Sequence, residues 1–206
     1  MNSSATVHII DDDESIRYAI ASLLRTVGLN SAGYNSAQEF LDKAELDGPG
    51  CLMLDVRLPG MNGLDFQDRL AEQHILCPVI LMSGHADVPM SVRGMKAGAI
   101  DFLTKPFRDQ DILDAVTSAI ARDEARLSQQ LNENQIQARY ARLSPREQQV
   151  TELVVQGKMN KQVAAILNIS EITVKIHRGS AMRKLEARTL ADMVRLVERV
   201  KASATA

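Results

Sequence analysis

Short apolar runs that alternate with helical segments constrain the fold of this chain most strongly. The apolar runs are Val7–Ile10, Cys51–Leu54, Val79–Met82 and Ala99–Leu103. Between them, apolar residues recur at helical spacing. Buried strands that alternate with helices are typical of a parallel sheet with helices on both faces. With a further short strand at Asn30–Tyr34, the pattern predicts an α/β domain whose doubly wound sheet has five strands and five helices.

Turn and capping residues set the expected limits of the helices. Gly28 ends a first helix over Glu14–Val27, and Ser36 with Glu39 forms a capping box for a second helix over Ala37–Glu45. The third helix is expected to end near residue 73 and the fourth at residue 98, and residues 112–120 belong to the fifth.

The residues that follow these strands have the chemistry of one site. They are a pair of acids, a lone acid, a hydroxyl and an ammonium group, namely Asp11 with Asp12, Asp55, Ser83 and Lys105. Ligands of parallel sheets bind beyond the carboxyl ends of the strands, so we expect these groups to meet. Neighbouring carboxylates repel one another unless a cation neutralises them, and oxygen ligands suit Mg2+. The combination predicts a phosphoryl-transfer site, whereas Asp55 alone would predict no more than a cap for the next turn.

A polar segment over residues 122–142 separates two halves of opposite charge. Residues 1–142 hold 13 lysines and arginines against 20 aspartates and glutamates, whereas residues 143–206 hold 11 against 6. The segment has high helix propensity and no glycine or proline, which predicts a helical linker, either a solvated spacer or a conditional coiled coil. We therefore expect a first domain over residues 1–121, a linker over 122–142 and a second domain over 143–206.

The second domain is predicted to be all-helical. Ser144 and Glu147 fit a capping box at the start of its first helix. A second helix over Lys161–Leu167 is joined by a short turn to a third helix that Ser170 caps. This arrangement is typical of a helix-turn-helix, in which the helix after the turn enters the major groove of DNA. A helical bundle that binds only protein is the alternative, and the net positive charge favours DNA.

Cysteine use and apolar content bear on the compartment. Cys51 and Cys77 lack metal-ligand spacing and are expected to be buried thiols in a reducing compartment. The sequence has no N-terminal apolar signal and no run long enough to span a bilayer. We therefore expect a cytoplasmic protein without membrane contact.

The strand-end residues resemble the receiver domain of two-component response regulators, and the resemblance covers residues 1–121. It implies that Asp55 is the phosphoacceptor, and that Asp11 and Asp12 hold Mg2+ together with Asp55 and the backbone carbonyl of Arg57. The residues that it implies for phosphoryl binding and switching are Ser83, Phe102 and Lys105. The Lys105–Pro106 peptide bond is expected to be cis, which proline permits.

Three stretches of the second domain resemble the LuxR-type effector domain, namely Leu143–Glu147, Asn160–Ala164 and Thr173–Arg178. With the receiver in front, the whole chain is similar to the FixJ and NarL branch of response regulators, most of all to FixJ. The implied base-facing residues are Lys175, Ile176 and Gly179, and the implied phosphate contacts are Lys161, Thr173 and Arg178. Gly179 departs from the family, which commonly has a longer polar side chain at this position.

The resemblance also implies partners and an output. A sensor histidine kinase phosphorylates Asp55, and the chain then forms a homodimer that binds double-stranded DNA and regulates transcription, with RNA polymerase as a further partner. Likeness to FixJ implies activation of nitrogen-fixation or microaerobic genes. The chain is not expected to be an enzyme beyond its own phosphoryl transfer and dephosphorylation. The expected dimer faces comprise Val92, Arg93, Lys96, Asp101, Met193, Val194 and Val197, with Arg93 or Lys96 pairing with Asp101.

Two other classes of protein remain open. The stretch from Asp11 to Ser15 also fits the Asp-x-Asp-x-Ser/Thr pattern of haloacid-dehalogenase-type phosphatases, with Asp11 as nucleophile and Asp13 as acid, which would leave Asp55 idle. The other class is a DNA-binding protein whose receiver is no longer phosphorylated. In a phosphorylated receiver, Arg57 and His85 would adjust the access of water to the phosphoryl group.

Overall fold

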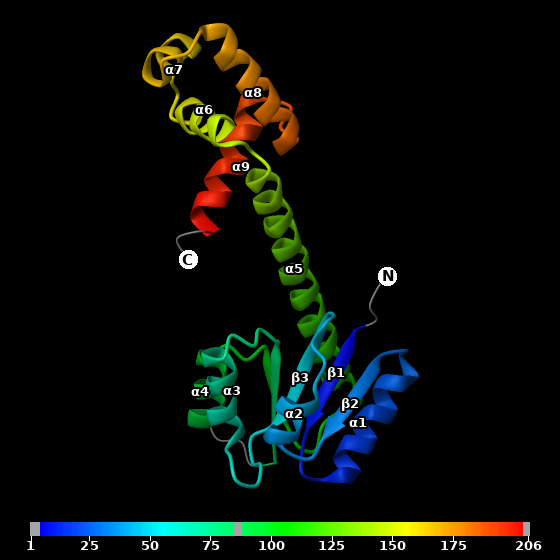
Figure 1. Cartoon of the computed structure of the whole chain (residues 1–206). Coiled ribbons are helices and arrows are strands. Elements are labelled where there is room, and N and C mark those ends of the chain that lie inside the picture. The colour runs from blue at the N-terminus through cyan, green and yellow to red at the C-terminus, as the bar shows by residue number, and fades with distance from the viewer. Residues whose placement is uncertain (1–4, 85–87, 204–206) are drawn as a thin grey trace. The chain divides into compact units, whose positions relative to one another are not determined.

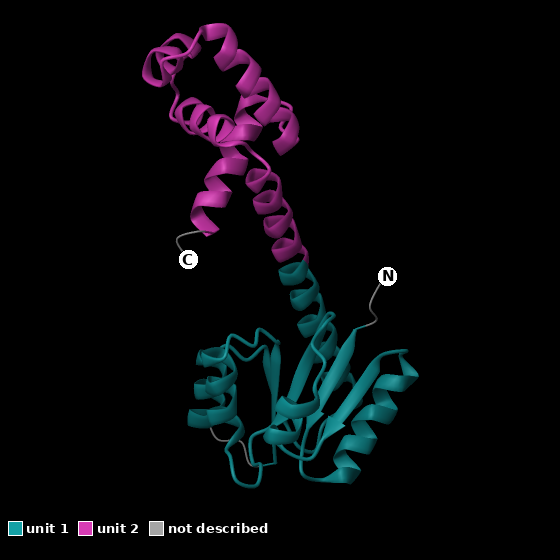
Figure 2. Ribbon diagram, in the orientation of Figure 1, with its two compact units in different colours: residues 1–127 teal, residues 128–206 magenta. Residues whose placement is uncertain are grey.

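The computed structural model describes residues 5–84 and 88–203, and the chain divides into two compact units (Figure 2). The N-terminal unit comprises Met1–Leu127 and the C-terminal unit comprises Ser128–Ala206. Within the described ranges, no helix combines the length and the apolar character that crossing a bilayer requires.

A parallel sheet of five strands forms the centre of the N-terminal unit (Figure 1). Its strands are β1 (Thr6–Ile10), β2 (Asn30–Tyr34), β3 (Gly50–Asp55), β4 (Val79–Ser83) and β5 (Asp101–Thr104), in the order β2-β1-β3-β4-β5. The strand order reverses between β1 and β3, and ligands of such flavodoxin-like sheets bind beyond the carboxyl ends at this point. The predicted doubly wound α/β domain is confirmed.

Helices cover both faces of this sheet. One face carries α1 (Glu14–Thr26) and α5 (Asp109–Ala141), and the other carries α2 (Ala37–Lys43), α3 (Gly63–Glu72) and α4 (Val88–Lys96). Side chains alternate along a strand, so Met53 belongs to the first core and Leu52 and Leu54 to the second. Every residue of β3 is buried, which agrees with the apolar run that predicted it.

Among the element limits that differ from the prediction, two differ for local reasons. Helix α2 ends at Lys43 instead of residue 45, because Ala44 has extended backbone angles. Strand β5 begins at Asp101 instead of residue 99, because the Ala99 N–H still bonds to the Gly94 carbonyl of α4 at 3.1 Å. Neither difference moves a residue that the sequence assigned to the strand-end site.

Helix α5 runs without a break over 33 residues, so the fifth helix and the predicted linker are one element. Its Asp123 is buried, accepts a hydrogen bond from the Gly50 N–H at 3.1 Å and pairs with Arg126 at 2.8 Å. These contacts fasten α5 to the start of β3 beyond the residue at which the first domain was expected to end.

The described residues of the C-terminal unit form four further helices, namely α6 (Pro145–Val155), α7 (Asn160–Leu167), α8 (Glu171–Leu185) and α9 (Leu190–Ser203). The predicted capping box of α6 is present, since the Glu147 N–H donates to Ser144 Oγ at 3.3 Å and the Ser144 N–H donates to Glu147 Oε2 at 2.7 Å. The turn between α7 and α8 is closed by Asn168 with a positive φ of 54°. The all-helical prediction is therefore confirmed, with α7 and α8 as the helix-turn-helix.

The exposure predicted for the dimer face on α9 is wrong for two of its three residues. Met193 and Val197 are 0% and 1% exposed and belong to the core of the C-terminal unit. Val194 is half-buried and lies outside that core. Residues four apart share one face of a helix, and in so small a unit α9 uses that face to complete the core.

Candidate functional site

The acidic residues that follow β1 and β3 meet at the carboxyl edge of the sheet. The two strands pair in parallel with Ile10 opposite Leu54, which places Asp11 beside Asp55. Asp11 and Asp55 are 0% and 6% exposed, whereas Asp12 is exposed. One carboxylate oxygen from each of these three residues lies within 4.8 Å of the other two. Three oxygen donors of one charge at this spacing suit a hard divalent cation such as Mg2+.

Lys105 joins the two buried acids. It follows β5, and its Nζ lies 2.6 Å from Asp11 Oδ2 and 2.5 Å from Asp55 Oδ2. Burial raises the pKa of Asp11, the charge of Asp55 raises it further, and the Lys105 bonds offset only part of that shift. Burial lowers the pKa of Lys105, but its bonds to the two acids outweigh burial and raise it. The expected cis peptide bond between Lys105 and Pro106 is present.

Backbone groups hold the other oxygen of each buried acid. Asp11 Oδ1 accepts the Asp13 N–H at 3.0 Å, and Asp55 Oδ1 accepts the Arg57 N–H at 2.9 Å. Each acid is therefore fixed at one oxygen and presents the other to Lys105. This geometry pre-orients the groups that would meet a transferring phosphoryl group.

The acidic cluster is supported by two residues, Arg17 and Gly63, that the sequence patterns did not identify. Arg17 of α1 donates from Nη1 to the Asp11 backbone carbonyl at 2.6 Å. Gly63 begins α3 so close to the phosphoacceptor strand that a Cβ there would lie 2.3 Å from the Asp55 carbonyl oxygen. A cation on α1, and a glycine at the start of a helix, were the available signals.

The remaining predicted residues of the N-terminal site take different positions. Ser83 is fully buried at the end of β4, and its carbonyl accepts the Lys105 N–H at 2.8 Å. Phe102 is half-buried and packs against the core formed with α2, α3 and α4. The side chain of Arg57 is exposed, and His85 lies outside the described residues.

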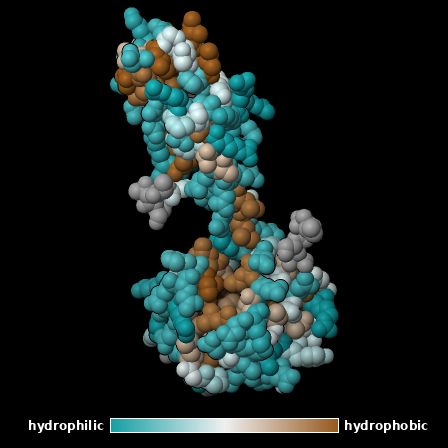
Figure 3. Space-filling view, in the orientation of Figure 1, coloured by the Kyte–Doolittle hydropathy of each residue, from teal (hydrophilic) through white to brown (hydrophobic). Residues whose placement is uncertain are grey.

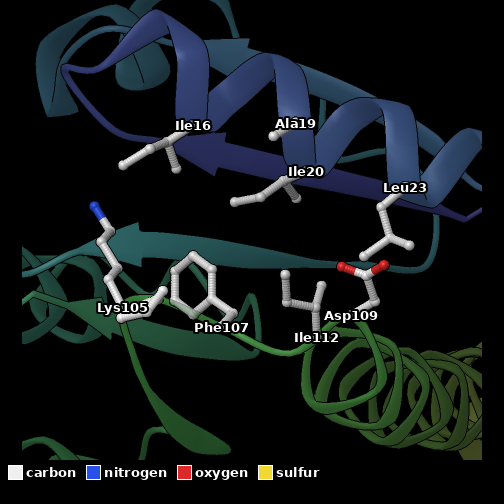
Figure 4. Close-up of a pocket in the computed structure, with 9 residues that line it drawn as sticks. Ile16, Ala19, Ile20, Leu23, Lys105, Phe107, Asp109 and Ile112 are labelled. Atoms are coloured by element: carbon white, nitrogen blue, oxygen red, sulfur yellow. The ribbon is translucent and has the colours of Figure 1, made fainter.

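An apolar cavity of about 480 Å³ lies between α1 and the start of α5, beside the acidic cluster. Ile16, Ile20 and Leu23 of α1 face Phe107 and Ile112 across it. Figure 4 shows Lys105 at one end of the cavity and Asp109 at the other. The same lysine thus lines the cavity and bonds to both buried acids.

Helix α4 exposes an apolar stripe where a dimer face was predicted. Val88, Val92 and Met95 are 77%, 45% and 46% exposed and lie on one side of the helix. Within the chain, Arg93 pairs with Asp65 and Asp68 of α3 at 2.7 and 3.0 Å. Lys96 and Asp101 are exposed.

The helix-turn-helix presents the predicted DNA contacts on a mostly exposed surface. Lys175, Ile176 and Gly179 of α8 and Lys161 of α7 are exposed. Thr173 is half-buried, with its hydroxyl 2.8 Å from that of the capping Ser170. Arg178 is half-buried and reaches Asn160 Oδ1 of α7 at 3.4 Å. The opposite side of α8 is core, with Val174, Ala181 and Leu185 buried.

Comparison with known families places both halves of the chain. The model of the response regulator receiver domain matches residues 7–117, and the model of the bacterial regulatory proteins of the luxR family matches residues 141–197.

Two curated relatives and a solved structure cover nearly the whole chain. Nodulation protein W of Bradyrhizobium diazoefficiens is 49% identical over 98% of this chain and 89% of its own length. The transcriptional regulatory protein FixJ of the same species is 38% identical over 97% of each chain. The structure of the response regulator StyR matches with a TM-score of 0.87 and 41% identity, over 96% of this chain and all of that one.

The chain is therefore a two-component response regulator. Within that class it belongs to the regulators whose receiver is followed by a LuxR-type DNA-binding domain. This membership decides against the phosphatase interpretation, as does the structure, since Asp55 is bonded to Lys105 and Asp13 caps α1 by accepting the Ser15 N–H at 2.8 Å. A receiver implies a sensor kinase as partner, and the second domain implies regulation of transcription through DNA.

Proposed function

We propose that phosphorylation of Asp55 by a sensor histidine kinase controls the pairing of this regulator on DNA. The observation that carries the proposal is Lys105, which bonds to both buried acids with one ammonium group. An ammonium in this place can neutralise a phosphoryl group on Asp55 as well as it neutralises the carboxylate.

The transfer would form one bond and break another. Asp55 Oδ2 would attack the phosphorus of a phosphohistidine, the P–N bond would break, and the imidazole would leave neutral after taking up a proton. Asp11, Asp12, Asp55 and the Arg57 carbonyl would hold Mg2+, in line with the spacing of the three carboxylates. When bound, the ion shields the negative charge of the phosphoryl oxygens.

The new phosphoryl group would bias the domain between two arrangements. Lys105 would exchange its bond to the Asp55 carboxylate for one to a phosphoryl oxygen, and the Ser83 hydroxyl would donate to another. These contacts exist only in the phosphorylated form, so they would stabilise the form in which Phe102 turns inward. The partly buried position of Phe102 supports this role.

Helix α4 is the dimer surface that the exposed side chains support. The apolar stripe of Val88, Val92 and Met95 would pack against a second copy of the chain. Lys96 or Arg93 would pair with Asp101 across the interface. Arg93 would first have to break its ion pairs with Asp65 and Asp68. These pairs are exposed to solvent, and such pairs contribute little to stability. Val194 on α9 would remain as a minor contact between the DNA-binding domains.

The kinase would approach over the cavity between α1 and α5. The cavity is apolar, and its Lys105 wall is shared with the phosphoacceptor site, so a docked helix there could deliver a phosphohistidine to Asp55. Exchange of the exposed Ala19 in this wall for arginine is expected to abolish transfer from the kinase and to spare transfer from acetyl phosphate. Exchange of the exposed Tyr18 on the same helix for alanine is the matched control.

The paired second domains would read a two-fold DNA site. Lys175, Ile176 and Gly179 would face base edges, and Lys161, Thr173 and Arg178 would contact the backbone, with α8 in the major groove. The likeness to FixJ supports activation of transcription together with RNA polymerase, with nitrogen-fixation or microaerobic genes as first targets to examine.

Incubation with acetyl phosphate and Mg2+ tests this function against its two alternatives. A regulator gains an acyl phosphate on Asp55, and footprinting then detects a protected DNA site. A phosphatase would release phosphate in a reaction that requires Asp11 and not Asp55. A receiver that has lost its function would gain no phosphate, and its DNA footprint would be the same with and without the phosphodonor.

A further inference from the structure

Gly179 stands at an unfavourable place for a glycine. It lies in the interior of α8, which runs from Glu171 to Leu185, and it is exposed on the same side as Lys175 and Ile176. Glycine loses more conformational freedom in a helix than any other residue, so an alanine here would favour the helix. We therefore expect a reason for the missing side chain, which is either a requirement of the chain's own fold or a contact with a binding partner.

The described part of the chain supplies no such reason. Gly179 is not among the residues with positive φ, and a Cβ built on it would meet no heavy atom of the described residues within 4 Å. Gly94 of α4 shows the opposite case, because a Cβ there would lie 2.2 Å from Leu81 Cδ1. The free space at Gly179 is thus required by neither backbone nor packing.

The neighbours of Gly179 indicate what uses the space. Ile172 and Ile176 are 71% and 64% exposed, and Lys175 and Arg183 are exposed on the same side of α8. Figure 3 shows apolar side chains at the surface around α7 and α8. Exposed isoleucines between cations fit a major groove, where thymine methyl groups are apolar and phosphates line the edges.

We propose that Gly179 is a specificity residue that acts through its missing side chain. A thymine methyl group of the operator lies in van der Waals contact with the Gly179 Cα, beside Ile176, and α8 seats more deeply in the groove than any side chain would permit. This inference rests on the proposed role of α8 in DNA reading, and it names the base feature that α8 reads.

A size exchange between protein and DNA tests it. The full-length chain, phosphorylated with acetyl phosphate, is used to select its operator from a random duplex library. Each operator thymine is then replaced in turn by deoxyuridine, which lacks only the methyl group. Dissociation constants of the unchanged chain and of the Gly179→Ala and Gly179→Val variants are measured by fluorescence anisotropy, and the melting temperature of each protein is recorded.

The expected result has three parts. Gly179→Ala raises the melting temperature but weakens operator binding by roughly tenfold, and valine weakens it further. One deoxyuridine substitution weakens binding of the unchanged chain by roughly fourfold, the value of one buried methyl group. The same substitution strengthens binding of the Gly179→Ala variant, because the removed methyl makes room for the added one. The dependence of binding on salt keeps its slope, since no phosphate contact changes.

Other outcomes overturn the inference. Unchanged operator affinity of Gly179→Ala means that no group approaches this position, and a lower melting temperature means that the chain's own fold requires the glycine. Equal effects of every deoxyuridine on both proteins mean that no methyl group contacts it. If the unchanged phosphorylated chain selects no duplex at all, the proposed DNA-reading function fails first, and this result is distinct from the others.

Discussion

The strand-end cluster of the N-terminal unit and the outer face of α8 are organised in different ways. Asp11 and Asp55 are buried, and each is held by a backbone N–H and by Lys105. Ile176 and Gly179 are exposed to solvent on α8. The chain completes the first site by its own contacts, whereas a partner must complete the second. Substitutions near the acids should therefore disturb fold and function together, and substitutions on the α8 surface should disturb binding alone.

The largest effect is expected in the core of the C-terminal unit and not on its surface. Met193→Ala should destabilise this unit by about 2–5 kcal/mol, because it leaves a cavity where a fully buried side chain stood. Val194→Ala, one residue further and half-buried, is the matched control and should cost less than about 1 kcal/mol. Urea unfolding of both variants measures this. Native stability for Met193→Ala combined with weaker dimerisation would restore the α9 dimer face.

The support of the acidic cluster is expected to be nearly as sensitive. Gly63→Ala places a Cβ against the Asp55 carbonyl, so it should destabilise the N-terminal unit by about 1–3 kcal/mol and slow phosphorylation by acetyl phosphate. Gly33→Ala on β2 is the control, because the three atoms nearest to its Cβ would be side-chain atoms of Arg17, the closest at an ordinary 3.5 Å. Equal stability and equal phosphorylation rates for the two variants would show that the close approach at Gly63 has no consequence.

The ion pair between Glu147 of α6 and Lys184 of α8 makes the stability of the C-terminal unit depend on pH. Burial would raise the pKa of Glu147, but the bonds from Lys184, Ser180 and Ser144 outweigh it and lower the pKa from 4.5 to about 2. The folded-state pKa is below the unfolded one, so this stabilisation is complete above pH 4.5 and is lost as the pH falls toward 2.

Thermal unfolding between pH 6 and pH 2.5 measures this dependence. Glu147→Gln should remove this part of the pH dependence and lower stability at pH 7. Identical curves for the variant and the unchanged chain would contradict the assigned role of Glu147.

The smallest effect is expected for a single surface charge. Lys161→Ala should weaken binding similarly on all duplexes and reduce the slope of log affinity against log salt by roughly one, as expected for one lost phosphate contact. Arg122→Ala removes an exposed cation outside the helix-turn-helix and should leave the slope unchanged. A Lys161 variant with an unaltered slope would remove this residue from the DNA contacts.

The same contrast explains how much the sequence could predict. The ends of apolar runs predicted which acids and which lysine meet, because parallel pairing brings strand ends to one edge whatever the details of packing. Ser36 and Ser144 marked helix starts, since each serine side chain accepts from the N–H of the glutamate three residues later. The box is complete only at Ser144, because the Glu39 side chain accepts from the Asn35 N–H instead of the Ser36 N–H. These features are local, or they follow from topology alone.

The features that could not be predicted depend on contacts between residues far apart in the sequence. Asp123 bonds to Gly50 across 73 positions, and no local pattern in α5 marks it as buried. Arg17 reaches a backbone carbonyl instead of a charged side chain, so charge pairing could not reveal it. Met193 and Val197 have the spacing of any amphipathic stripe, and only the packing of α9 against its neighbours decides which side faces the core.

One comparison of two proteins tests the central claim most directly. The unchanged chain and its Asp55→Asn variant are treated with acetyl phosphate and Mg2+, and the mass of each species in solution and its occupancy of the selected operator are measured; Asp114→Asn, an exposed acid of α5, serves as the control. Phosphodonor should convert the unchanged chain and the control to dimers that occupy the operator, and should leave Asp55→Asn as before. Equal dimerisation and operator occupancy by Asp55→Asn after the same treatment would contradict the account.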